Sequence, residues 1–300
     1  MAFLDWLKII FLGIVEGVTE WLPISSTGHL ILVDALWKTE NHPVLTDTFM
    51  NMFEVVIQFG AIIAVIVLFW QKLWPFHTKA KRKKRSWFRE ASDNRVVCGI
   101  QRFCDNHCYM DKIVMWLKIA LSCLPAILVG LPLDDWMEEH LYNPPVVAAM
   151  LILYGVAFLL VEKRNQSRTP RIRTMNDFRW TDALLIGVFQ VLALIPGTSR
   201  SGATILGGIL IGASRGLAAE YTFFLAVPVM FGASLLKIVK FGAFSGVQGI
   251  VLLLGMVVAF VVSLIAIKFL MSYIKKHSFA AFGYYRIALG LLVLLYFLVK

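Results

Sequence analysis

Six apolar stretches recur along this sequence, and each is long enough to cross a lipid bilayer as an α-helix, which needs about 20 residues. A bilayer core offers backbone N–H and C=O groups no water, so each stretch must satisfy its own backbone as a helix. The regular alternation of apolar and polar residues that marks a membrane β-barrel is absent. The sequence therefore predicts an all-α polytopic membrane protein, in agreement with a mean hydropathy of +0.74. The predicted spans are 52–70, 113–132, 146–161, 221–240, 247–271 and 281–299.

The positive charges predict how the chain is oriented. The formal net charge is +10, and the basic residues cluster in the segments 79–89 (KAKRKKRSWFR) and 162–173 (EKRNQSRTPRIR). Membrane proteins keep loops rich in Lys and Arg on the cytoplasmic side, so we interpret the charge in this way and not as a nucleic-acid surface. Alternation of the spans then places the acidic loop 134–145 and both termini on the outer side.

Two further apolar stretches, 1–37 and 182–212, are interrupted by proline, glycine and hydroxyl residues. The interruptions read PISSTG after Leu22 and PGTSRSG after Ile195. Non-helical backbone at membrane depth persists only where it is buried in protein or lines a wet cavity. We therefore expect each stretch to form a re-entrant helical hairpin whose tip borders a cavity.

The chain also resembles itself. A shift of 174 residues aligns Gly13 with Gly187, Glu16 with Gln190, Ser25 with Ser199, and Gly28 with Gly202. We predict one membrane domain, 1–300, built from repeat one (1–162, with a polar cytoplasmic insertion at 72–112) and repeat two (180–300). A hairpin and three spans make an odd number of crossings, so the second repeat is expected upside down. In such inverted repeats the binding site lies where the two broken hairpins meet.

Two carboxylates stand in the first hairpin before its break. Glu16 and Glu20 are one helical turn apart and share a face. Away from water, like charges at this spacing require a cation or a shared proton. The alternative is that this helix end reaches the headgroups and both carboxylates are solvated. Because ionisable residues inside a membrane are functional candidates, we favour a catalytic role.

Hydroxyl groups follow the break and open a new helix. Ser25, Ser26 and Thr27 precede Gly28, and a helix start with free N–H groups binds anions. His29 lies three positions after Ser26, so its imidazole is expected to reach the same bound group. Each hydroxyl taken alone is equally well explained as an ordinary N-cap.

The second hairpin combines a cation with hydroxyl groups at its break. The planar fork of Arg200 can bind two phosphate oxygens through parallel hydrogen bonds. A structural salt bridge from Arg200 to Glu16 or Glu20 is the alternative, and both can hold in different states. The neighbouring candidate ligands are Thr198, Ser199, Ser201, Gly202 and Thr204.

Two carboxylates, an imidazole, a guanidinium and two helix starts suit a diphosphate accompanied by a divalent cation. Phosphoryl transfer mainly requires positioning and charge neutralisation, which this set provides. A nucleotide is not indicated, since no Walker motif is present. A secondary transporter or lipid flippase is the rival interpretation, because inverted repeats with broken hairpins are typical of transporters.

The segment EGVTEWLPISSTGHL (16–30) and the motif PGTSRSG resemble the two signature regions of the bacterial undecaprenyl-diphosphatase family, also called bacitracin resistance proteins. The resemblance covers the chain apart from the insertion at 76–111. It implies a multi-pass hydrolase of the bacterial cell membrane that converts undecaprenyl diphosphate to the monophosphate. That reaction recycles the lipid carrier of peptidoglycan synthesis and confers bacitracin resistance. The resemblance also implies a site open toward the outer side.

The resemblance assigns roles residue by residue. Glu16 and Glu20 would handle the metal and protons, Ser26 and His29 would supply the catalytic hydroxyl and imidazole, and a divalent cation, Mg²⁺ or Ca²⁺, is implied. The nucleophile stays open between Ser26, His29 and water, with Ser26 favoured. The expected partners are undecaprenyl diphosphate and membrane lipid, no nucleic acid is expected, and a homodimer is left open. The implied diphosphate ligands are Ser199, Arg200 and Thr204.

The four cysteines are expected to be reduced and incidental to function. They do not form a recognisable disulfide framework, and with His107 their spacing matches no standard zinc pattern. They are Cys98, Cys104, Cys108 and Cys123.

Overall fold

The computed structural model describes residues 2–37, 42–76, 97–98, 101, 104 and 106–299, and this part of the chain is helical with short connections. Six helical segments are long and apolar enough to cross a membrane. The prediction of an all-α fold with six spans is therefore confirmed. The spans are α3 and α4 together (Asp47–Val56 and Gln58–Leu68), α7 (Met110–Leu141), α8 (Pro144–Asn165), α11 (Arg215–Phe241), α12 (Gly246–Tyr273) and α13 (Ala280–Val299).

The two interrupted stretches form pairs of short helices. The first gives α1 (Phe3–Thr19) and α2 (Ser26–Leu36), and residues 20–25 between them are the first break. The second gives α9 (Trp180–Val191), a 3₁₀ turn at Leu192–Leu194, and α10 (Arg200–Leu210), and residues 195–199 are the second break. Each break contains a proline, which lacks an N–H and disfavours helix at the residue before it.

Each pair of short helices packs against a long helix. Helix α1 packs on α12, α9 packs on α7, and α8 packs on α13. The last contact depends on glycine: a β-carbon on Gly155 would lie 2.8 Å from the carbonyl oxygen of Gly283. Small residues of this kind let helix backbones approach closely where lipid removes the usual hydrophobic driving force.

One predicted loop is mostly helix. The acidic segment expected to form a loop at 134–145 continues α7 as far as Leu141, and only Tyr142 and Asn143 separate α7 from α8. The segment DDWMEEHL is polar but contains good helix formers, so the helix outlasts its apolar part. The Asn143 side chain then caps α8 by accepting a hydrogen bond from the Val146 N–H at 3.0 Å.

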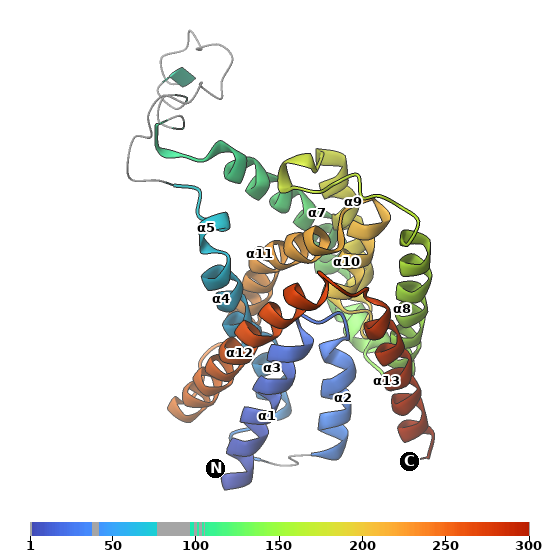
Figure 1. Ribbon diagram of the computed structural model, residues 1–300. Helices are drawn as coiled ribbons and strands as arrows, with labels where there is room; N and C mark the ends of the chain where they lie inside the picture. The colour runs from blue at the N-terminus through green and yellow to red at the C-terminus, as the bar shows by residue number, and fades with distance from the viewer. Residues whose placement is uncertain are drawn as a thin grey trace.

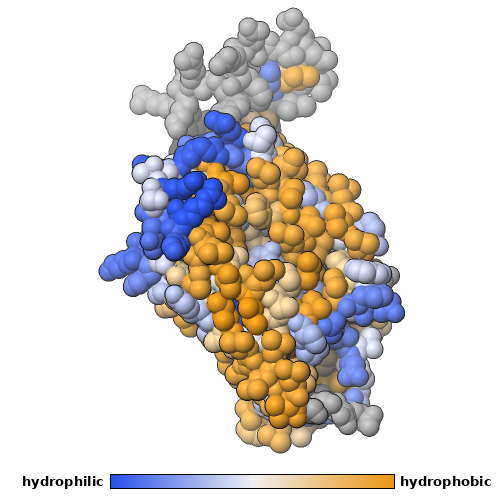
Figure 2. All heavy atoms as spheres, turned by 90° about the vertical axis from the view of Figure 1, so that its right-hand side faces the viewer, coloured by the Kyte–Doolittle hydropathy of each residue, from blue (hydrophilic) through white to orange (hydrophobic). Residues whose placement is uncertain are grey.

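The two ends of the molecule differ in what they carry. Both termini lie at the lower end in Figure 1, and the connection after α8 lies at the upper end. A broad apolar surface separates hydrophilic patches in Figure 2, as expected for a protein surrounded by lipid. The basic segment 79–89 lies outside the described residues. The four cysteines are free thiols.

Candidate functional site

Helices α2 and α10 begin in the same unusual way. Their N-caps, Ser25 and Ser199, have φ angles of 72° and 70°, and they are the only non-glycine residues with positive φ in the described part of the chain. Each serine hydroxyl accepts a hydrogen bond from a backbone N–H three residues on, Gly28 at 3.4 Å and Gly202 at 3.2 Å. A left-handed residue with a side chain costs about 1–2 kcal/mol. Such strain clusters at functional sites.

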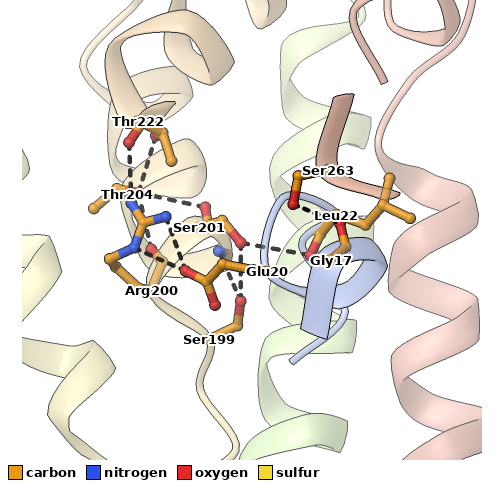
Figure 3. Close-up of polar contacts among 10 residues, drawn as sticks. Gly17, Glu20, Leu22, Ser199, Arg200, Ser201, Thr204, Thr222 and Ser263 are labelled. Atoms are coloured by element: carbon orange, nitrogen blue, oxygen red, sulfur yellow. Dashed lines mark hydrogen bonds and ion pairs between the residues drawn. The ribbon is translucent and has the colours of Figure 1, made fainter. Parts of the chain in front are cut away.

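An ion pair joins the two breaks. Arg200 donates from Nε and Nη2 to Oε1 of Glu20 at 3.2 and 3.0 Å, and from Nη1 to the carbonyl of Thr222 at 3.0 Å. The two side chains are only 12% and 9% exposed. Figure 3 shows the pair between the end of α1 and the start of α10. The predicted meeting of the breaks is confirmed, and Glu20 is the partner of Arg200.

The hydroxyl groups of the second hairpin bond to one another and to the backbone (Figure 3). Ser201 lies 3.1 Å from the Ser199 hydroxyl and donates to the carbonyl of Leu22 at 3.5 Å. Thr204 donates to the carbonyl of Arg200 at 2.8 Å and accepts from Thr222 at 2.9 Å. These contacts fix the helix start that carries Arg200.

The Glu16 carboxylate is the most unusual group of the site. It is fully buried, and neither oxygen has a hydrogen-bond partner among the described residues. Its polar neighbours are Glu20, Glu54, Gln58 and Arg200. An ionised carboxylate without a partner is costly to bury, so Glu16 must hold a proton or lie beside a cation.

This arrangement fits a divalent cation shared with a substrate. Within the described residues, no group of three or more His, Cys, Asp or Glu side chains could hold a metal alone. Mg²⁺, however, is usually held by one or two carboxylates, with water and substrate phosphate supplying the other oxygens. Glu16, whose two oxygens have no hydrogen-bond partner among the described residues, could supply one such carboxylate, and its neighbour Glu20 could supply a second.

Ser26 and His29 have different surroundings. Ser26 opens α2, is half-buried, and makes no side-chain hydrogen bond to another described residue. In His29, Nδ1 lies 2.7 Å from the Ser25 carbonyl, and Nε2 lies 2.7 Å from the Tyr285 hydroxyl. A carbonyl only accepts, so Nδ1 carries the proton and Nε2 accepts from Tyr285. The expectation that His29 reaches the same bound group as Ser26 stays a prediction.

A cavity of about 320 Å³ opens beside the two breaks. Thr27 lines it from the first hairpin, and Pro196 lines it from the second. Glu54 and Lys237 contribute charges of opposite sign from α3 and α11. Residues from both interrupted stretches thus border one recess, whose lining mixes polar and apolar side chains.

Arg286 is an important residue that the sequence analysis missed. It is fully buried on α13. It donates to the carbonyl of Pro23 at 3.2 Å and to those of Gly197 and Thr198 at 2.9 and 2.8 Å. One guanidinium therefore holds both breaks. An arginine inside an apolar span was the signal that could have found it, and the same signal marks Glu54 and Gln58.

The remaining predicted ligands lie within the same two breaks. The side chain of Thr198 is fully buried, and its hydroxyl has no hydrogen-bond partner among the described residues. Gly28 and Gly202 each place a backbone N–H on a capping serine. All residues proposed from the sequence thus belong to the two helix starts or to the end of α1.

The chain was compared with known proteins. The family model described as bacitracin resistance protein BacA matches residues 9–292. An undecaprenyl-diphosphatase from Acetivibrio thermocellus is 55% identical over 296 residues, which is 98% of each chain. Proteins of the same name from Enterococcus faecalis and Clostridium acetobutylicum are 52% and 48% identical, covering 98% and 100% of each chain.

Proposed function

The chain belongs to the bacitracin resistance protein BacA family, and we propose that the two meeting breaks are its active site. Its activity is the hydrolysis of undecaprenyl diphosphate to undecaprenyl phosphate and inorganic phosphate. The reaction recycles the lipid carrier of cell-wall synthesis. The observation that supports this proposal is the Arg200–Glu20 pair, in which a guanidinium at the start of α10 meets a carboxylate at the end of α1.

The architecture that we propose is an inverted repeat with two re-entrant hairpins. The equal turns at Ser25 and Ser199 support this, as does the packing of α1 on α12 and of α9 on α7. We further propose that the end with the termini faces outward, because the basic connection 162–173 lies at the other end. Substrate would then enter from the outer side. A homodimer stays a prediction.

The substrate would bind with its diphosphate in the recess and its tail in lipid. Arg200 would exchange Glu20 for phosphate oxygens, since the same donors serve both. The N–H groups at the starts of α2 and α10 add two further anion sites. Lys237 at the rim supplies another positive charge.

The chemical step would be in-line displacement at the terminal phosphorus. The Ser26 hydroxyl, which makes no hydrogen bond to the residues that the structure describes, would attack phosphorus, and the bond to the bridging oxygen would break. Undecaprenyl phosphate leaves, and water then hydrolyses the phosphoserine to inorganic phosphate. Glu16 or His29 would take the proton of Ser26. Direct attack by water oriented at Ser26 gives the same products.

A divalent cation, Mg²⁺ or Ca²⁺, would be held by Glu16 with Glu20, and it would neutralise charge on the phosphate oxygens. When Arg200 turns to the substrate, Glu20 loses its partner and becomes available to the cation. The chain's own residues therefore link substrate binding to cation binding.

Phosphate release tests the activity directly. Purified protein in detergent has no transmembrane gradient, so turnover of undecaprenyl diphosphate there distinguishes a phosphatase from a transporter. Trapping the phosphorylated protein and locating the modified residue then tests the nucleophile. Phosphoserine at Ser26 is expected. Phosphohistidine at His29 would overturn this choice, and multiple turnovers with no covalent intermediate would favour water.

A further inference from the structure

A second cavity, of about 490 Å³, lies where α8 and α10 end. Helix α8 begins just after Tyr142, which lines the cavity beside the two breaks, and its 22 residues span about 33 Å. Helix α10 likewise starts at Arg200 and ends in this second cavity. The cavity is therefore at the far end of the spans, where the basic segment 162–173 connects α8 to α9.

The lining combines a cationic rim with an apolar floor. Arg164, Arg168 and Arg171 form the rim, and no acidic side chain lines the cavity. Hydrogen-bonding groups are added by Asn165, Ser167 and Thr169. The floor is formed by Val161, Ile209, Leu210 and Ile211.

Two of the three arginines are available to a ligand. Arg171 is engaged, since it donates to Asp182 at 2.6 Å and to the Ile211 carbonyl at 3.2 Å. Arg164 and Arg168 are exposed, and within the described residues their side chains make no hydrogen bond or ion pair. Arg215 nearby shows the contrast, because it is paired with the buried Glu162.

We propose that this cavity binds the headgroup of an anionic phospholipid. Arg164 and Arg168 would hold the phosphate by charge-assisted hydrogen bonds, and Asn165 and the two hydroxyls would contact the glycerol. The apolar floor favours a lipid over a free phosphate ion, because it places apolar side chains of α8 and of the end of α10 beside the arginines. Basic pockets between spans on the cytoplasmic side bind anionic headgroups in this way.

The test compares two double variants of the full-length protein. R164Q/R168Q removes the two available cations. K163Q/K275Q removes two exposed charges that do not line the cavity. Lys275 lies at the same end of the molecule, because the N–H of Phe279, four residues later, is hydrogen-bonded to Glu162, the neighbour of Lys163. Binding of phosphatidylglycerol and of phosphatidylcholine is titrated in detergent at 150 mM salt and followed by native mass spectrometry. Thermal unfolding confirms that both variants fold.

We expect R164Q/R168Q to weaken phosphatidylglycerol binding by about tenfold, and K163Q/K275Q to weaken it by less than about threefold. Binding of phosphatidylcholine should be unchanged in both double variants. Phosphate release from undecaprenyl diphosphate should stay within about twofold, so a failure of this proposal is separate from a failure of the active-site assignment. Equal losses in the two variants, or unchanged binding in R164Q/R168Q, would overturn the site. Full displacement of the lipid by millimolar inorganic phosphate would overturn the choice of a lipid.

Discussion

The first and second breaks share a backbone and differ in charge. Ser25 and Ser199 have nearly equal positive φ angles, and each caps its helix through a glycine N–H. The first break follows two carboxylates, Glu16 and Glu20, whereas the second is followed by Arg200. The same turn has thus been used twice, once beside acidic groups and once beside a basic one.

This difference in charge indicates what each break would contribute to the proposed site. Two identical helix starts would both attract anions and would leave a bound diphosphate without a place for its cation. With carboxylates on one side only, the proposed site would separate anion binding from cation binding across a distance of one ion pair. The following predictions test that division, from the largest expected effect to the smallest.

Arg200→Ala should remove the anion side of the site. Loss of a preorganised donor to a developing charge costs on the order of 10²- to 10³-fold in rate, and Arg200 supplies two donors to one oxygen. Arg200→Lys should recover little, because an ammonium lacks the planar fork. Phosphate release in detergent measures this, with the exposed Arg173→Ala as control. Near-normal turnover in Arg200→Ala would end its proposed role.

Arg286→Met should destabilise the folded conformation of both breaks. The substitution leaves three buried carbonyls, those of Pro23, Gly197 and Thr198, without this donor. Unsatisfied buried groups cost about 1–3 kcal/mol each, so we expect a loss of at least about 3 kcal/mol in the free energy of unfolding. Loss of helical circular dichroism with increasing SDS measures it. A variant as stable as the parent would show that the breaks do not depend on this clamp.

Glu16→Gln should weaken the proposed binding of the divalent cation. The divalent cation concentration for half-maximal activity should rise by about tenfold or more, the range seen when the support of a metal site is removed. Exposed Asp47→Asn, at the start of α3, serves as the control for lost negative charge. If the cation requirement is unchanged while turnover falls, Glu16 handles protons only.

The two caps should respond alike. Alanine at Ser25 or Ser199 keeps the strained φ and loses the cap, which costs about 1 kcal/mol. Glycine relieves the strain, so Ser25→Gly and Ser199→Gly should stay within about 0.5 kcal/mol of the parent. Thermal unfolding in detergent compares the four variants. A cost at one break and none at the other would contradict the equivalence of the two turns.

Much of this site was visible in the sequence. The six spans followed from apolar length, and the breaks followed from Pro23 and the PGTSRSG motif, because non-helical backbone at membrane depth persists only where it is buried in protein or lines a wet cavity. The pairing of Arg200 with one of the two glutamates was the alternative to its predicted phosphate-binding role, and the structure shows that pairing with Glu20.

Other features depend on contacts that no local pattern encodes. His29 meets Tyr285, which is 256 residues away and lies in an apolar span. Arg286 could be suspected from its charge, but its three acceptors are backbone atoms and leave no trace in the sequence. The end of α7 was misplaced for a different reason, since hydropathy reports where a membrane ends and not where a helix ends.

The clamp formed by Arg286 also bears on how the molecule can move. Its donors are divided between Pro23 in the first break and Gly197 and Thr198 in the second, so moving one break past the other would break the bonds to at least one of them. A transporter that alternates by rocking its two repeats against each other needs contacts at its centre that can break and re-form. Here one buried guanidinium ties the two breaks together at that place, so the parts of the chain it joins are held in one arrangement.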